Sequence, residues 1–259
     1  MTLSDVRCFL LDLDGTFYIG NALIEGSLAF IEKVIASGRD YLFLTNNSSH
    51  NANFYVRRLR EYGLNTDRSH VLTSGEAACE IIRKRYPGRS AFVLGNEYLR
   101  ADFMEAGIPL DDEHPEVVAV GYDNTITYRT LRLACDHVRA GLPYIATHPD
   151  INCPTETGFI PDIGPILAYI ECSTGRKPDL IVGKPNTGIV EAALRRTGRQ
   201  PREMAMVGDR LYTDIETGLR SGMLSILVMT GETTEEMLAR STTVPDMKFN
   251  RLSDMIPYL

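Results

Sequence analysis

The sequence predicts an α/β protein, with a Rossmann-like core of parallel strands and a second, inserted α/β cap domain. Three observations predict this class. Short apolar runs alternate along the chain with amphipathic helical stretches, an order typical of parallel sheets. Several of these runs end in polar clusters, as strands do at a ligand-binding sheet edge. The 259 residues are 44% hydrophobic and 24% charged, an ordinary globular composition with room for one or two domains.

The first core elements follow one another in strand–helix order. Residues 6–13 are apolar on both alternating faces, as expected for a strand that is buried in a parallel sheet. Residues 27–37 have an apolar stripe at helical spacing and are followed by a glycine, which favours a helix end. A second strand is predicted over 41–44 and a second helix over 51–62.

The same alternation returns in the last third of the chain. It predicts strands over 179–183, 204–207 and 225–230, and helices over 188–197, 212–221 and 234–240. We therefore assign residues 1–77 and 179–259 to the core.

The stretch in between, residues 78–178, is predicted as the inserted α/β domain. Its helices are expected over 76–86, 97–106, 128–140 and 163–174, and its strands over 91–94, 117–121 and 143–147. Composition hardly shifts at these boundaries, so the assignment depends on the chemistry of the flanking motifs.

Charge and cysteine content narrow the classes of function. The formal net charge of −7 argues against nucleic acid or an anionic membrane as the main partner, because both favour a basic surface. The five cysteines are widely spaced and form no Cys-x-x-Cys pair, which predicts reduced thiols rather than disulfides or structural zinc. No apolar run is long enough to span a membrane. Together these features predict a cytoplasmic protein.

Four of the predicted core strands end in polar clusters. Each cluster alone is common in turns or helix caps, but the four together, in this order, are far more specific. Residues two apart on a strand point to the same side, so the two aspartates of the first cluster can face one pocket. The clusters are Asp12-Leu13-Asp14-Gly15-Thr16, Thr45-Asn46-Asn47-Ser48, Gly183-Lys184-Pro185, and Gly208-Asp209 with Asp214.

The charges in these clusters indicate a metal site. Four carboxylates, those of Asp12, Asp14, Asp209 and Asp214, would repel one another by about 4 kcal/mol per pair at ~4 Å and an effective dielectric constant near 20. Such a group favours a hard cation with oxygen ligands, and Mg²⁺ fits best. With Mg²⁺ and Lys184, the site is nearly neutral before an anionic substrate enters.

The same four clusters resemble the motifs of the haloacid dehalogenase-like (HAD) hydrolases. Three segments are similar to the 4-nitrophenylphosphatase-like, or NagD-type, branch, which has a large C2-type cap between the second and third motifs. They are Leu44-Thr45-Asn46-Asn47-Ser48, Ala146-Thr147-His148-Pro149-Asp150 and Val207-Gly208-Asp209-Arg210-Leu211-Tyr212-Thr213-Asp214. The long stretch between Asn46 and Lys184 has room for that cap.

The resemblance implies a phosphatase of small phosphate monoesters. In it, Asp12 attacks phosphorus and forms an aspartyl-phosphate, while Asp14 protonates the leaving oxygen and then activates water. The resemblance also implies that Thr45, the Asn46 backbone N–H and Lys184 bind the phosphoryl group.

Further expectations concern the metal and the leaving group. Mg²⁺ is expected on the Asp12 carboxylate, the Asp14 carbonyl and Asp209, while Asp214 orients Lys184 or a metal-bound water. In the cap, His148 and Asp150 are candidates for contacts with the substrate, a small phosphorylated metabolite. A homodimer through the cap is left open.

Two alternatives stand beside the phosphatase. A phospho-acceptor module that resembles a response-regulator receiver would be phosphorylated without turnover, but its acceptor aspartate lies on a different strand from its acidic pair. A dehalogenase or a sugar phosphomutase would keep the fold. Asp14 argues against the dehalogenase, and the short stretch from Asp14 to Thr45 leaves no room for a mutase cap.

Overall fold

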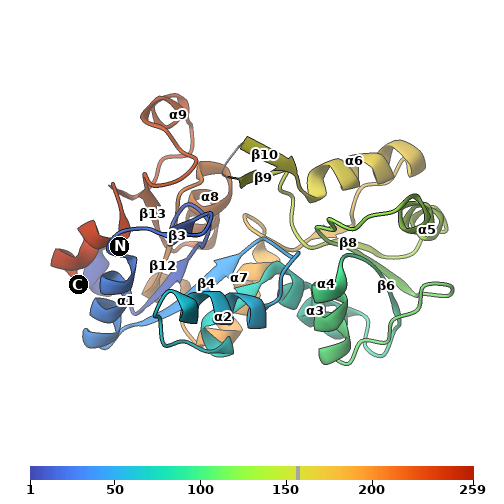
Figure 1. The fold of residues 1–259 in the computed structure, drawn as a ribbon, viewed down its shortest axis with the longest axis horizontal. Coiled ribbons are helices and arrows are strands. Elements are labelled where there is room, and N and C mark those ends of the chain that lie inside the picture. Colours follow the sequence, from blue (N-terminus) through green and yellow to red (C-terminus); the bar gives the residue numbers. More distant parts are fainter. Residues whose placement is uncertain (156–157) are drawn as a thin grey trace. The chain divides into compact units, whose positions relative to one another are not determined.

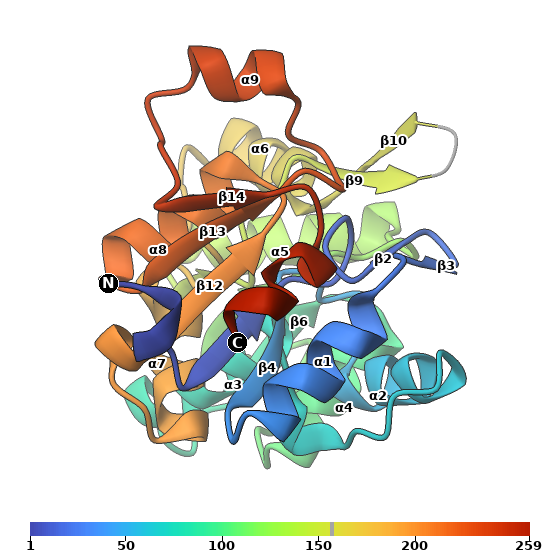
Figure 2. The ribbon, with the colours of Figure 1, turned by 90° about the vertical axis from the view of Figure 1, so that its left-hand side faces the viewer.

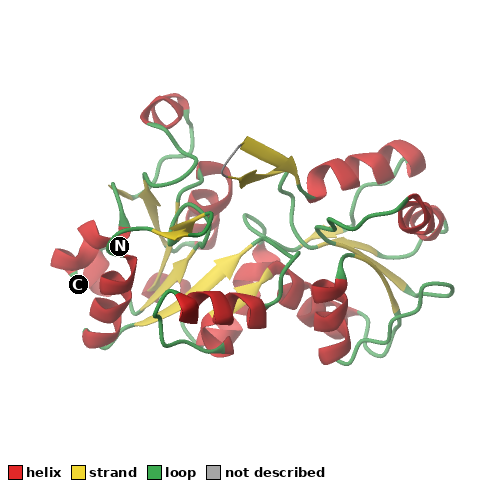
Figure 3. Cartoon of the chain, in the orientation of Figure 1, coloured by secondary structure: helices red, strands yellow, loops and turns green. Residues whose placement is uncertain are grey.

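The computed structural model describes residues 1–155 and 158–259 of the chain, which divides into two compact units. Unit 1 comprises Met1–Thr45, Tyr55–Leu72 and Val190–Leu259, and unit 2 comprises Asn46–Phe54 and Thr73–Ile189. Helices and strands alternate along the chain (Figures 1 and 3), and the α/β class is confirmed. The domain boundaries at 78 and 178 stay predictions.

A six-stranded sheet with the order β14-β13-β12-β1-β4-β5 forms the centre of unit 1 (Figure 2). Its strands are β1 (Cys8–Leu11), β4 (Asp40–Thr45), β5 (Val71–Thr73), β12 (Met204–Gly208), β13 (Leu224–Val228) and β14 (Met247–Phe249). Strand β1 pairs in parallel with both β12 and β4. Every side chain of β1 is buried, which explains its apolar residues on both faces.

The helices around this sheet follow the predicted periodicity. They are α1 (Ser27–Ala36), α2 (Ala52–Glu61), α7 (Thr187–Thr197), α8 (Glu216–Ser221) and α9 (Glu235–Arg240). Helix α1 packs against the sheet through Phe30, whose ring meets Phe9 of β1 edge to face at 5.5 Å. The helix predicted over 212–221 begins as a π-helical turn, Leu211–Ile215, before α8.

A four-stranded sheet with the order β11-β8-β7-β6 forms the centre of unit 2. Its strands are β6 (Ala91–Leu94), β7 (Val117–Val120), β8 (Tyr144–Ala146) and β11 (Leu180–Ile181). The strand before Lys184 was predicted to belong to the core sheet, and this is wrong, because β11 pairs with β8. A two-residue strand has too little sequence of its own to specify its neighbour.

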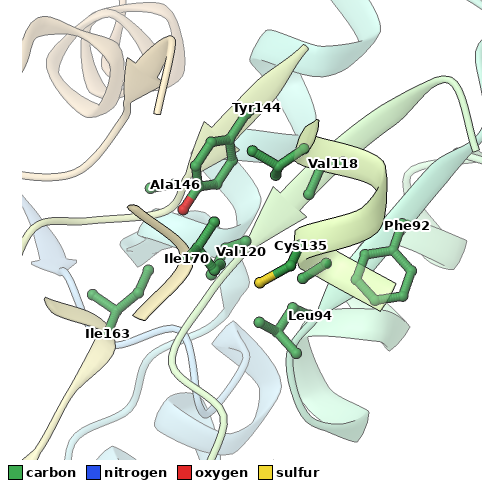
Figure 4. Packing of buried hydrophobic residues seen from close by; sticks show 11 residues of the cluster. Phe92, Leu94, Val118, Val120, Cys135, Tyr144, Ala146, Ile163 and Ile170 are labelled. Atoms are coloured by element: carbon green, nitrogen blue, oxygen red, sulfur yellow. The ribbon is translucent and has the colours of Figure 1, made fainter. Parts of the chain in front are cut away.

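Helices α3 (Ser74–Arg85), α4 (Glu97–Glu105), α5 (Tyr128–Arg139) and α6 (Ile163–Thr174) complete unit 2. Buried side chains of β6, β7 and β8 pack with those of α5 and α6, among them Val120, Cys135 and Ile170 (Figure 4). Even the longest of the described helices have 12 residues. Within residues 1–155 and 158–259, none is long and apolar enough to cross a lipid bilayer.

Two short hairpins were not predicted from the sequence. One pairs β2 (Tyr18–Ile19) with β3 (Ala22–Leu23), and the other pairs β9 (Asn152–Thr155) with β10 (Gly158–Pro161). Strands of two to four residues give no usable alternation, and every residue of β10 is exposed.

All five cysteines are free thiols, but they differ in exposure. Burial raises the pKa of Cys8 to about 12 and holds the pKa of Cys79 well above its usual value, whereas Cys172 is exposed. Because the thiolate is the reactive form, we expect Cys172 to react fastest with an aromatic disulfide reagent at pH 8, and Cys8 and Cys79 not to react in the folded protein. Absorbance stopped-flow checks this.

The control for the thiol measurement is Cys172→Ser, which should remove the fastest phase and leave the others. In guanidinium chloride, all five thiols of the wild-type protein should react. A fast phase that survives the substitution would contradict the assignment.

Candidate active site

The carboxyl ends of β1 and β12 bring three buried carboxylates together in unit 1. Leu11 of β1 lies opposite Val207 of β12, and the Asp12 N–H donates to the Val207 carbonyl at 2.9 Å. The two strands therefore leave the sheet at the same level. One carboxylate oxygen each of Asp12, Asp209 and Asp214 lies within 4.8 Å of the others, and all three residues are buried.

These three carboxylates fit a divalent cation in donor type and in spacing. At 4.8 Å, a pair of like charges costs roughly 3 kcal/mol at an effective dielectric constant near 20. A hard cation with oxygen ligands would turn this repulsion into attraction. Asp12 and Asp209 were predicted as ligands, and Asp214 was predicted to act without direct ligation. The structure brings a carboxylate oxygen of Asp214 within the same 4.8 Å, while Asp214 Oδ2 accepts the Arg210 N–H at 3.1 Å.

The backbone at positions 15 and 231 approaches the Asp209 carboxylate so closely that only glycine fits at either position. A Cβ atom on Gly15 would lie 2.5 Å from Asp209 Oδ2, and one on Gly231 would lie 2.0 Å from it. The same oxygen accepts the Glu232 N–H at 2.6 Å, and Oδ1 accepts the Thr16 hydroxyl at 3.3 Å. The carboxylate therefore has a fixed orientation.

Asp14 has a different environment from the three clustered carboxylates. It is half-buried, and its Oδ2 accepts the hydroxyl of Tyr18 at 3.4 Å. Burial, and next the neighbouring Asp14 charge, hold the pKa of Tyr18 well above its usual value, so this hydroxyl remains a donor. The Arg58 guanidinium lies 4.1 Å from the centroid of the Tyr18 ring. Asp14 is more exposed to solvent than Asp12, and it is therefore better suited to exchange protons.

Thr45 ends β4, the strand that pairs with β1 on the side opposite β12. Its side chain is buried. Thr45, the first of the predicted phosphate-binding residues, thus lies at the same edge of the unit 1 sheet as the carboxylates.

Asn46 and Lys184 are bonded to each other in unit 2. The Asn46 side-chain oxygen accepts the Lys184 N–H at 2.7 Å, and its side-chain nitrogen donates to the Lys184 carbonyl at 3.0 Å. The same nitrogen donates to Asp150 Oδ1 at 3.0 Å. The sequence predicts a role only for the backbone N–H of Asn46, and the structure adds these three hydrogen bonds of its side chain.

His148 makes its contacts inside unit 2. It has no exposed surface, its Nδ1 lies 2.9 Å from the Thr147 hydroxyl, and its Nε2 lies 2.8 Å from Asp162 Oδ1. One atom each of His148, Asp150 and Asp162 also lies within 4.8 Å of the others. Because protein groups engage both ring nitrogens, a contact with the substrate would require one of these bonds to break.

Comparisons with known proteins show which family the chain belongs to. Models described as "Haloacid dehalogenase-like hydrolase" and "HAD-hydrolase-like" match residues 9–109 and 181–255. A curated acid sugar phosphatase of Staphylococcus aureus is 36% identical over 258 residues, 99% of each chain. The chain belongs to the haloacid dehalogenase-like hydrolases.

Solved structures of the same family agree. A 4-nitrophenylphosphatase from Thermotoga maritima is 47% identical, with a TM-score of 0.96 over 98% of each chain. A p-nitrophenyl phosphatase from Archaeoglobus fulgidus is 32% identical, with a TM-score of 0.94 over 98% of this chain and 100% of the other. The predicted resemblance to NagD-type phosphatases is confirmed.

One segment of this hydrolase site was not predicted from the sequence, Thr230-Gly231-Glu232-Thr233. The Thr230 hydroxyl donates to the Gly15 carbonyl at 2.6 Å, and the Thr233 hydroxyl donates to the Asp209 carbonyl. The segment directly follows β13 and is the same kind of polar strand end that revealed the other clusters. It was missed because the strand was predicted to extend to residue 230, whereas β13 ends at Val228.

Proposed function

We propose that this phosphatase hydrolyses small phosphate monoesters, such as 4-nitrophenyl phosphate, sugar phosphates or nucleoside monophosphates, through an aspartyl-phosphate on Asp12. The convergence of Asp12, Asp209 and Asp214 at one sheet edge carries the proposal. Three buried carboxylates are costly without a cation, and a cation bound there could also stabilise the charge of a transferring phosphoryl group.

The proposed mechanism divides the work between two carboxylates of different exposure. A carboxylate oxygen of Asp12 forms a bond to phosphorus as the ester oxygen departs, and Asp14 gives that oxygen a proton. Asp14 then removes a proton from the water that attacks the phosphoaspartate and releases phosphate. The Tyr18 hydroxyl, which donates to Asp14 Oδ2, holds this carboxyl in one orientation.

The remaining residues stabilise charge. We propose that the Thr45 hydroxyl, the Asn46 N–H and the Lys184 ammonium hold the phosphoryl oxygens. Asp12, Asp209 and the Asp14 carbonyl would hold Mg²⁺, with Asp214 as an additional carboxylate beside it. Bound there, Mg²⁺ would offset the negative charge of the transferring group.

Metal removal tests the cation. Phosphate release from 4-nitrophenyl phosphate should fall about 100-fold or more in EDTA, because several kcal/mol of charge stabilisation would be lost. Excess Mg²⁺ should restore the rate, and excess K⁺ at equal ionic strength should not. Full activity of metal-stripped protein in EDTA would contradict the proposed site.

The receiver-like alternative predicts phosphorylation without turnover. The full-length relatives named as phosphatases favour turnover. Release of many phosphates per chain would exclude the alternative, and a single phosphate per chain would support it.

Location and assembly are further proposals. Five free thiols are compatible with the reducing cytoplasm, where we place the protein. A homodimer through the cap stays a prediction.

A further inference from the structure

The side chain of Asn46 clamps the main chain of Lys184. Its amide oxygen accepts the Lys184 N–H at 2.7 Å, and its amide nitrogen donates to the Lys184 carbonyl at 3.0 Å. The two residues are 5% and 2% exposed, so water does not compete for these bonds. The clamp fixes the backbone from which the Lys184 ammonium extends.

Asp150 adds a third hydrogen bond that favours one of the two orientations of this amide. An asparagine amide can turn over and exchange its oxygen with its nitrogen, and only its partners fix the choice. A carboxylate only accepts hydrogen bonds, so Asp150 Oδ1, at 3.0 Å, requires the NH₂ group on its side. A turned-over amide would lose this bond together with both bonds to the Lys184 main chain, so all three partners favour the same orientation.

We infer that Asp150 is a positioning residue for Lys184, acting through the amide of Asn46. The inference rests on the proposed function, in which Lys184 binds the phosphoryl group. It assigns Asp150 to the phosphate end of the reaction rather than to the contact with the leaving group expected from the sequence.

The surroundings of Asp150 are built to hold it in place. Its carbonyl accepts the Gly164 N–H at 2.8 Å in the first turn of α6, whose N-terminal cap is Asp162. Next to the clamp, a Cβ atom on Gly183 would lie 2.6 Å from the Asn46 side-chain oxygen. Gly183 therefore leaves the amide little room to shift, and the hydrogen bond to Gly164 ties Asp150 to the start of α6.

The two roles of Asp150 differ in how they depend on the leaving group. A residue that acts through Lys184 affects the phosphoryl group, which all substrates share. We therefore expect Asp150→Ala to lower kcat by roughly tenfold or more, by a similar factor for 4-nitrophenyl phosphate, a sugar phosphate and a nucleoside monophosphate. A direct contact would instead change KM by factors that differ among the three esters.

A double-mutant cycle with Asn46→Ala tests the route of the effect. If Asp150 acts through Asn46, Asp150→Ala should lower kcat in the wild type but hardly at all in the Asn46→Ala background. Asp150→Asn keeps an acceptor oxygen and should recover part of the rate. It also carries the test if Asp150→Ala does not fold. The control is Asp179→Asn, which should retain wild-type kcat. Asp179 is an exposed residue of unit 2 whose carboxylate accepts the Tyr144 N–H.

The outcomes separate this inference from the proposed function. Equal losses for all three esters together with a non-additive cycle would support it. Additive losses, leaving-group-dependent KM changes, or wild-type kcat in a folded Asp150→Ala protein would overturn it while the wild type still hydrolyses esters. If the wild type hydrolyses none of the esters with Mg²⁺, the proposed function itself fails.

Discussion

Asp12→Asn should lower hydrolysis of 4-nitrophenyl phosphate by about 1,000-fold or more, because an amide cannot replace the carboxylate as a nucleophile. The same change should leave the metal-free protein at least as stable as the wild type. It removes one of three buried like charges that lie within 4.8 Å of one another. Loss of activity without loss of stability is the expected signature, measured by phosphate release and by urea unfolding in EDTA.

The control for Asp12→Asn is Asp5→Asn, an exposed carboxylate of the same unit. It should keep wild-type activity, which would show that the loss belongs to the site. An Asp12→Asn protein that retains more than about a tenth of the rate would exclude Asp12 as the nucleophile. A protein that loses activity only because it unfolds would show its transition at lower urea concentration.

Gly15→Ala should reduce both stability and activity, because its new Cβ atom would enter the space of the Asp209 carboxylate. Gly15 has φ +87°, so any side chain there also costs about 1 kcal/mol of backbone strain. The clash with Asp209 at 2.5 Å adds roughly 1–3 kcal/mol. Displacement of Asp209 by about 1 Å to relieve this clash should lower kcat about 100-fold. Urea unfolding and steady-state kinetics measure the two effects.

Gly38→Ala separates the strain from the clash. Gly38 has φ +73°, but a Cβ atom there would meet nothing within 4 Å. It should cost only the backbone strain and leave kcat unchanged. Equal effects of the two substitutions on stability and kcat would contradict the tight fit around Asp209.

Local patterns predicted the elements best where turn or cap residues marked both ends of an apolar or amphipathic run. The strand predicted over 91–94 matches β6 to the residue, and the helix predicted over 163–174 matches α6. Both are bounded by turn or cap residues, such as Asp162 before α6. The polar strand ends likewise predicted the meeting of Asp12, Asp209 and Asp214, because adjacent parallel strands end at one edge.

Pairing between distant segments could not be predicted in the same way. The choice of β8 as the partner of β11 depends on the whole of unit 2, and two residues of strand do not encode it. The bond between Asn46 and Asp150 joins residues 104 positions apart, through atoms that either residue could have offered to water or substrate. The sequence alone predicts a polar loop residue at His148, whereas in the structure this side chain is fully buried and its Nε2 contacts Asp162 Oδ1.

The position of β1 between β4 and β12 has a consequence for synthesis of the chain. Strand β4 follows β1 closely, but β12 begins only at Met204, far along the chain. Until then, one edge of a fully apolar strand has no partner in the nascent polypeptide, and an unpaired edge of this kind is prone to aggregation. We therefore expect ribosome-bound fragments that end before β12 to need a chaperone, and the carboxylate cluster to form only after Asp214 has emerged.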